Sequence, residues 1–121
     1  MEEKLFWYWK EKLGLSDWVI EFKYNMNPED MAIADAVGCA SWEESSKTGL
    51  VEIMDPAHYG ERVVPFDLEK TIVHELLHIK TTFISSDCGK TKKRIAHQLI
   101  DDLAKAFVDA RRDHEIEGED L

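Results

Sequence analysis

The chain is poor in cysteine and has no long apolar run. Its 121 residues contain two cysteines, Cys39 and Cys88, which form no Cys-x-x-Cys pair. This usage is typical of a reducing compartment in which both side chains stay as thiols. No stretch approaches the roughly 18 apolar residues of a membrane span, and the start Met-Glu-Glu-Lys lacks the basic and apolar regions of a signal peptide. We therefore expect a cytoplasmic protein with no membrane segment.

Basic residues are also scarce. The sequence has 15 lysines and arginines against 25 aspartates and glutamates, which gives a formal net charge of -10. Direct binding to nucleic acid or to an anionic membrane needs a basic face, so this charge argues against both. The acidity either serves solubility or suits a neutral or basic partner.

The length leaves no room for a second lobe. A chain of 121 residues is expected to form one domain around a single core. We assign this domain to residues 1–112, followed by an acidic tail over 113–121 that we expect to be disordered. A catalytic site in so small a domain would use an open or truncated cleft.

One short motif carries most of the chemical information. Residues 71–79 read Thr-Ile-Val-His-Glu-Leu-Leu-His-Ile, an H-E-x-x-H motif inside an apolar segment of helical period. Histidines four residues apart lie one turn above each other on a helix, so His74 and His78 can reach one metal ion. Imidazole ligands suit zinc, and Glu75 is placed to take a proton from a water on the metal.

The surroundings of the motif favour a metal site over two surface histidines. Leu68, Ile72, Leu76 and Ile79 form an apolar stripe that Val73 and Leu77 widen, so the helix is predicted to be central and buried. Buried imidazoles are costly without a hydrogen bond or a metal. Asp67 is a suitable N-cap for this helix, and Glu69 suits its positive end.

The motif resembles the extended signature of zincin metallopeptidases. In that signature a small or β-branched residue and an uncharged residue precede the first histidine, as Thr71 and Ile72 do here, and uncharged residues fill the gap, as Leu76 and Leu77 do. Lys80 departs from it, since the family usually has an apolar residue there. Over roughly residues 5–112 the chain is similar to small single-domain metallopeptidases of phages and bacteria, which are related to minimal gluzincins.

The remaining pattern predicts an α+β fold, a small β-sheet packed against the H-E-x-x-H helix and a C-terminal helix. An amphipathic helix is expected over 3–13, with Leu5, Phe6, Trp9 and Leu13 toward the core and Gly14 as its end. Strands are expected over 18–24, 36–43 and 50–54, the last two joined by a hairpin loop. The resemblance implies that the third strand lies at the sheet edge and binds an extended substrate by β-addition.

The C-terminal helix offers the third metal ligand. It is predicted to end near Arg112 and to pack through Ala96, Ile100, Leu103, Phe107 and Ala110. His97 lies beside this stripe and is the best candidate ligand, with Asp101 or water as alternatives. Similar small zincins carry a glutamate at about this place, and three imidazoles also make a catalytic zinc site. Asp101 is better suited to accept the free proton of an imidazole ligand.

The sequence thus predicts a zinc-dependent metallopeptidase that acts on a peptide or protein substrate. Zn²⁺ would be held by His74, His78 and His97, with Glu75 as the catalytic base. Tyr59 or His58, in the loop before the helix, could donate a hydrogen bond to the oxyanion. Three alternatives stay open: a cysteine thiolate as an inhibitory ligand, a zinc hydrolase acting on another amide, and a zinc-binding interaction module whose site is structural or vestigial.

Overall fold

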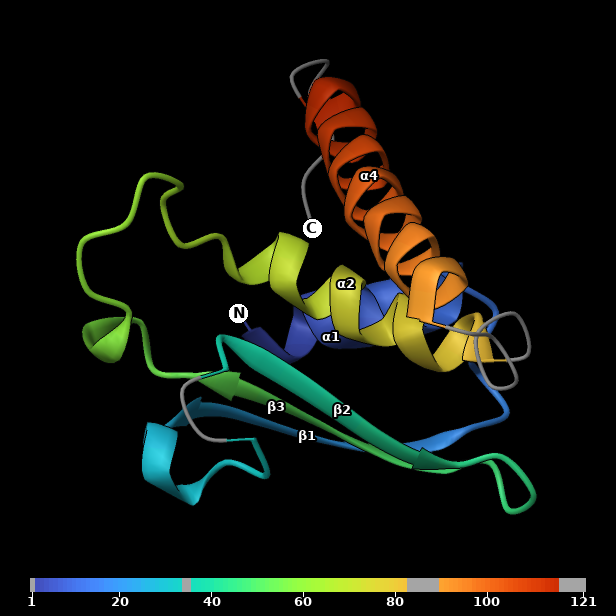
Figure 1. Cartoon of the computed structure of the whole chain (residues 1–121). Coiled ribbons are helices and arrows are strands. Elements are labelled where there is room, and N and C mark those ends of the chain that lie inside the picture. The colour runs from blue at the N-terminus through green and yellow to red at the C-terminus, as the bar shows by residue number, and fades with distance from the viewer. Residues whose placement is uncertain (1, 34–35, 83–89, 116–121) are drawn as a thin grey trace.

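The fold is α+β, as predicted. The computed structural model describes residues 2–33, 36–82 and 90–115. In chain order the elements are α1 (Glu2–Lys12), β1 (Val19–Met26), the short 3₁₀ turn η1 (Pro28–Asp30), β2 (Gly38–Glu43), β3 (Thr48–Met54), the turn η2 (Pro56–His58), α2 (Leu68–Lys80) and α4 (Lys90–Glu115) (Figure 1). In the part of the chain that is described, no helix is long and apolar enough to cross a bilayer.

The strands form one mixed sheet in the order β1-β3-β2. β2 and β3 pair antiparallel across a short hairpin, whereas β1 pairs parallel to β3. The prediction that the third strand is an edge is therefore wrong, because β3 has a hydrogen-bonded neighbour on both sides. A hairpin pattern shows that two strands pair but does not show on which side a third one joins. The edge that lies near α2 is β2.

The helices cover one face of this sheet (Figure 1). The predicted apolar positions of α2 are buried, with Ile72, Val73 and Leu76 fully inaccessible, so α2 is the central helix of the core. From α1, Phe6 and Trp9 join the same cluster, and Gly14 ends that helix with a positive φ of 73°. Strand residues Val51 and Ile53 complete the core beneath α2.

The C-terminal helix packs through only part of the predicted stripe. Ile100 is buried and Leu103 packs against the core, as predicted, whereas Phe107 is 37% exposed and Ala110 lies on the surface. Ala104 and Val108 are buried in their place. The apolar arc of α4 is wider than the part that α2 covers, so the sequence did not show which part would be buried. The buried stripe adjoins His97 and therefore turns His97 toward α2. α4 continues to Glu115, three residues beyond the predicted boundary, and the rest of the tail lies outside the described residues.

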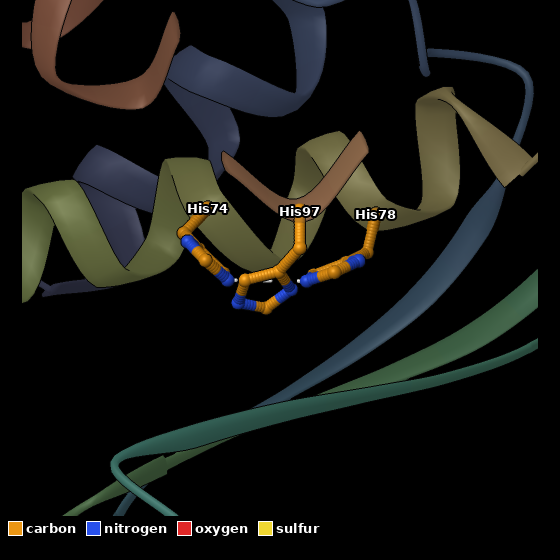
Figure 2. A group of neighbouring side chains, drawn as sticks. All are labelled: His74, His78 and His97. Carbon is orange, nitrogen blue, oxygen red and sulfur yellow. Dashed lines mark hydrogen bonds between the residues drawn. The ribbon is translucent and has the colours of Figure 1, made fainter. Parts of the chain in front are cut away.

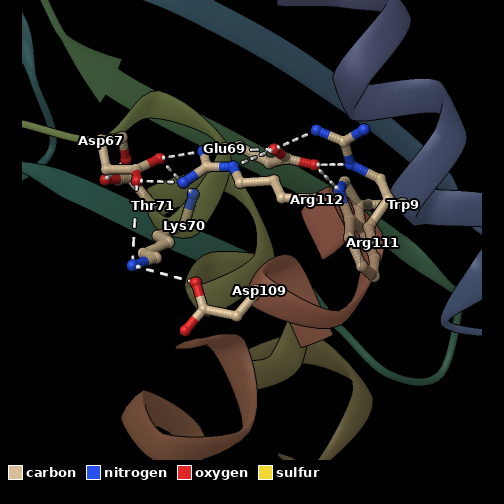
Figure 3. Close-up of polar contacts among 8 residues, drawn as sticks. All are labelled: Trp9, Asp67, Glu69, Lys70, Thr71, Asp109, Arg111 and Arg112. Carbon is tan, nitrogen blue, oxygen red and sulfur yellow. Dashed lines mark hydrogen bonds and ion pairs between the residues drawn. The ribbon is translucent and has the colours of Figure 1, made fainter. Parts of the chain in front are cut away.

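A buried carboxylate fixes α4 against α2 (Figure 3). Glu69 is 3% exposed and accepts hydrogen bonds from the Trp9 indole at 2.7 Å and from the Arg111 guanidinium at 2.5 and 2.7 Å. Arg112 contacts both oxygens of Asp67 at 2.9 Å, and Asp67 also caps α2 through the Lys70 amide as predicted. Burial alone would raise the pKa of Glu69, but the hydrogen bonds from Arg111 and Trp9 lower it.

Candidate metal centre

His74 and His78 lie on successive turns of α2 and point to the same side (Figure 2). Their Nε2 atoms are 3.1 Å apart, and their ring centroids are 4.8 Å apart. Both side chains are partly buried. The helical spacing of the motif therefore places two nitrogen ligand atoms side by side, as expected from the sequence.

His97 reaches the same point from α4. Its ring centroid is 4.9 Å from that of His74 and 5.1 Å from that of His78. One nitrogen from each of the three rings lies within 4.8 Å of the others, and Figure 2 shows the rings converging from the two helices. The structure thus brings together the three histidines that the sequence analysis selected, although His97 comes from a separate element.

The donor set fits zinc. Zinc with nitrogen ligands at about 2.0–2.1 Å in tetrahedral geometry holds its ligand atoms roughly 3.3 Å apart. The His74 and His78 nitrogens are 3.1 Å apart, and the nitrogens of all three rings lie within 4.8 Å of one another. Metal binding requires neutral imidazoles. Burial lowers the pKa of His74, and burial together with the neighbouring imidazoles lowers the pKa of His78 to about 4. The exposed His97 leaves one side of the cluster open.

Asp101 orients one of the candidate ligands. Its Oδ1 lies 2.6 Å from Nδ1 of His74, so it accepts the proton that sits on that nitrogen. The Nε2 lone pair of His74 is then directed toward the other two rings. The sequence predicts that Asp101 accepts the free proton of an imidazole ligand. That ligand is His74 on α2 and not His97, which lies one turn away from Asp101 on α4.

Glu75 is largely buried, but its carboxylate reaches the pocket. It is 7% exposed, lines the pocket beside the histidines, and accepts no hydrogen bond from the described residues. Because no fully buried side-chain oxygen among them lacks a partner, its oxygens are open to solvent in the pocket. Burial, with a smaller contribution from the charge of Asp101, raises its pKa to about 8. A carboxyl group in a pocket whose pKa is shifted in this way is a candidate functional group.

The edge strand approaches Glu75 closely at Gly38. A Cβ atom at Gly38 would lie 3.1 Å from Oε2 of Glu75 and 2.9 Å from Cγ2 of Thr71. A larger residue would have to displace one of these side chains. Sequence analysis missed this position, although a glycine inside a predicted strand is a known signal of close approach.

A pocket of about 590 Å³ surrounds these groups. Its walls come from the edge strand β2, the loop that ends at Phe66, and facing sides of α2 and α4. The Tyr59 hydroxyl donates to the carbonyl of Val64 at 2.6 Å, and the exposed His58 is not part of the lining. The structure therefore gives neither residue the free, pocket-facing donor that was considered for an oxyanion.

Cys39 lines the same pocket but is poorly suited to bind a metal. Its side chain is buried and its sulfur lies 3.3 Å from a carboxylate oxygen of Glu52. Burial, reinforced by that hydrogen bond, raises its pKa to about 11, so it stays a thiol. The other cysteine, Cys88, lies outside the described residues.

No protein-family model, curated protein or solved structure matches this chain. The resemblance to zincins thus depends on the motif and on the site geometry alone.

Proposed function

We propose that the protein is a zinc-dependent metallopeptidase. The observation that carries this proposal is the convergence of three imidazoles next to the largely buried Glu75, inside one open pocket. Three histidines would hold the ion, and the open side would admit water and substrate. When bound, zinc supplies a water of lowered pKa and polarises a carbonyl group.

The protein residues supply proton transfer and positioning. The Glu75 carboxylate accepts a proton from the attacking water and returns it to the nitrogen of the leaving amine. For the first step Glu75 must be ionised, and a cation beside it lowers its raised pKa toward that state. Asp101 keeps the proton of His74 on Nδ1 throughout.

The edge strand supplies the substrate platform. β2 lies next to α2 and borders the pocket through Gly38, Ala40 and Trp42, and only β3 pairs with it among the described strands. Its outer backbone groups are free to pair with an extended peptide. The role first given to the third strand thus passes to β2, and Gly38 lets the peptide-binding edge and the catalytic carboxyl group lie together.

The test measures metal and cleavage in parallel. Protein purified without added zinc is analysed for elements, as wild type and as His97→Ala, and then incubated with a mixture of unrelated peptides that is read by mass spectrometry. We expect one zinc per chain, peptide cleavage, and loss of both in His97→Ala. The matched control is His58→Ala, which removes an exposed histidine outside the pocket.

A Glu75→Gln variant separates the proposed enzyme from a zinc-binding interaction module. This change keeps the shape of the side chain but removes the proton acceptor. A peptidase would retain zinc and lose cleavage, whereas a structural or vestigial site would show no cleavage in either form. The absence of stoichiometric metal in the wild type would refute the proposal.

A further inference from the structure

One lysine in the pocket lining is left without a partner. Asp67 is held by the two terminal nitrogens of the Arg112 guanidinium, and Asp101 accepts a hydrogen bond from the neutral His74. The ammonium group of Lys70 has carboxylates at 3.5 and 4.0 Å. Lys105, also in the pocket lining, has no charged or hydrogen-bonded partner among the described residues. Its ammonium group is therefore free to pair with a ligand, in a chain whose net charge is -10.

The two lysines lie at the same end of the pocket because α4 runs antiparallel to α2. Asp101 contacts His74, Asp109 contacts Lys70, and Arg112 contacts Asp67. Lys105 lies one turn after Asp101 and one turn before Asp109, so it faces the stretch of α2 between His74 and Lys70. The end of the pocket that holds the two lysines is thus the end toward the start of α2.

The direction of β2 predicts which part of a bound peptide lies at this end of the pocket. Gly38 lies against Thr71, and the Trp42 indole donates to the Thr82 hydroxyl at 2.9 Å, so β2 runs in the same direction as α2. Antiparallel strand pairs outnumber parallel ones about two- to threefold. A peptide added antiparallel to β2 would enter at Trp42 and leave at Gly38, which places the residues after the cleaved bond beside Lys70 and Lys105.

We propose that this end of the pocket is a carboxylate-binding subsite in which Lys105 is the main recognition residue and Lys70 supports it. The inference rests on the proposed peptidase function and names its substrate class: peptides with a carboxylate shortly after the cleaved bond. That carboxylate comes either from an acidic side chain or from the free C-terminus of a short peptide. The unpaired ammonium group of Lys105 selects such substrates from others by electrostatic complementarity.

The test compares three fluorescent peptides of one sequence. The first ends in a free carboxylate, the second in an amide, and the third in an amide with a glutamate two residues before it. Binding to zinc-loaded Glu75→Gln protein is measured by anisotropy, and cleavage by the wild type is followed by mass spectrometry. We expect at least one acidic peptide to bind about 1.5- to fivefold more tightly than the neutral amide, the range for one exposed ion pair.

Two variants of Lys105 test whether this residue causes the preference for acidic peptides. Lys105→Gln should remove most of the preference for the acidic peptide, and Lys105→Glu should reverse it. The control Lys4→Gln changes the net charge equally at an exposed site outside the pocket and should leave the preference unchanged. A preference confined to the free acid identifies C-terminal recognition, and one shared with the glutamate peptide identifies side-chain recognition.

Three results would overturn the inference, and they are distinguishable. Equal binding of all three peptides, with cleavage observed, would reject the subsite and leave the peptidase function intact. No binding and no cleavage of any peptide by zinc-loaded protein would reject both together. If Lys105→Gln and Lys4→Gln weaken the preference for acidic peptides equally, the preference comes from the overall charge of the protein, and the subsite is rejected.

Discussion

Glu75 should make the metal-free protein less stable than its glutamine variant, by an amount that depends on pH. Its folded pKa of about 8 lies above the ordinary value of 4.5, so the native state holds this proton where the unfolded chain has lost it. Stability from this group is complete below pH 4.5 and is lost as the pH rises through 8. From the shift, the penalty is about 1 kcal/mol at pH 5 and about 3 kcal/mol at pH 7.

Glu75→Gln removes the ionisation and therefore this pH dependence. In protein freed of metal with a chelator, the free energy of unfolding of the variant relative to wild type should rise by about 2 kcal/mol between pH 5 and pH 7. Urea denaturation at both pH values measures it, and any constant packing difference cancels in the comparison. The lowered pKa values of His74 and His78 act alike in both proteins.

Two further measurements sharpen this prediction. The exposed Glu11→Gln, on α1, is the matched control and should show no pH-dependent gain. Saturating zinc should reduce the gain of Glu75→Gln, because a neighbouring cation favours the ionised carboxylate. A stability difference that stays constant from pH 5 to pH 7 in the metal-free protein would refute the account of Glu75.

Two other predictions follow from hydrogen bonds that cross between helices. Asp101→Asn should weaken zinc binding by about 10- to 100-fold in a chelator competition while leaving the fold unchanged, since Asp101 is exposed but orients His74. Glu69→Ala should cost about 3–5 kcal/mol in urea denaturation, because it leaves the charge of Arg111 and the Trp9 indole without their buried acceptor. Since the pKa of Glu69 is lowered, its stabilising effect should be present above pH 4.5 and fade as the pH falls below that value. A wild-type protein whose stability does not fall in this way at acidic pH would contradict the prediction.

The features that the sequence predicted well are local ones. The period of α2, its Asp67 cap and the adjacency of His74 and His78 all depend on residues within one or two turns, and the structure shows each of them. His97 is harder to predict, since its use depends on the rotation of a second helix. A histidine beside an apolar stripe needs a partner, which favours His97, and the structure places it next to the motif.

The features that were missed depend on contacts between distant parts of the chain. The central place of β3 follows from its parallel pairing with β1, which no hairpin pattern reveals. The burial of Val108 goes together with contacts of Arg111 and Arg112, on the same helix, with carboxylates some 42 to 45 residues away. These contacts decide which side of an amphipathic helix is covered, and hydrophobic periodicity alone does not contain them.

The division of the three histidines between α2 and α4 has a thermodynamic consequence. An ion held by both helices would act as a cross-link, so its binding and the docking of α4 would be one linked equilibrium. Each tenfold rise in free zinc above the dissociation constant would then add about 1.4 kcal/mol to the resistance of the two helices to separation. By reciprocity, a substitution at the buried Ala104 or Val108 that weakens the packing of α4 would also lower the affinity for zinc, although neither side chain binds the metal.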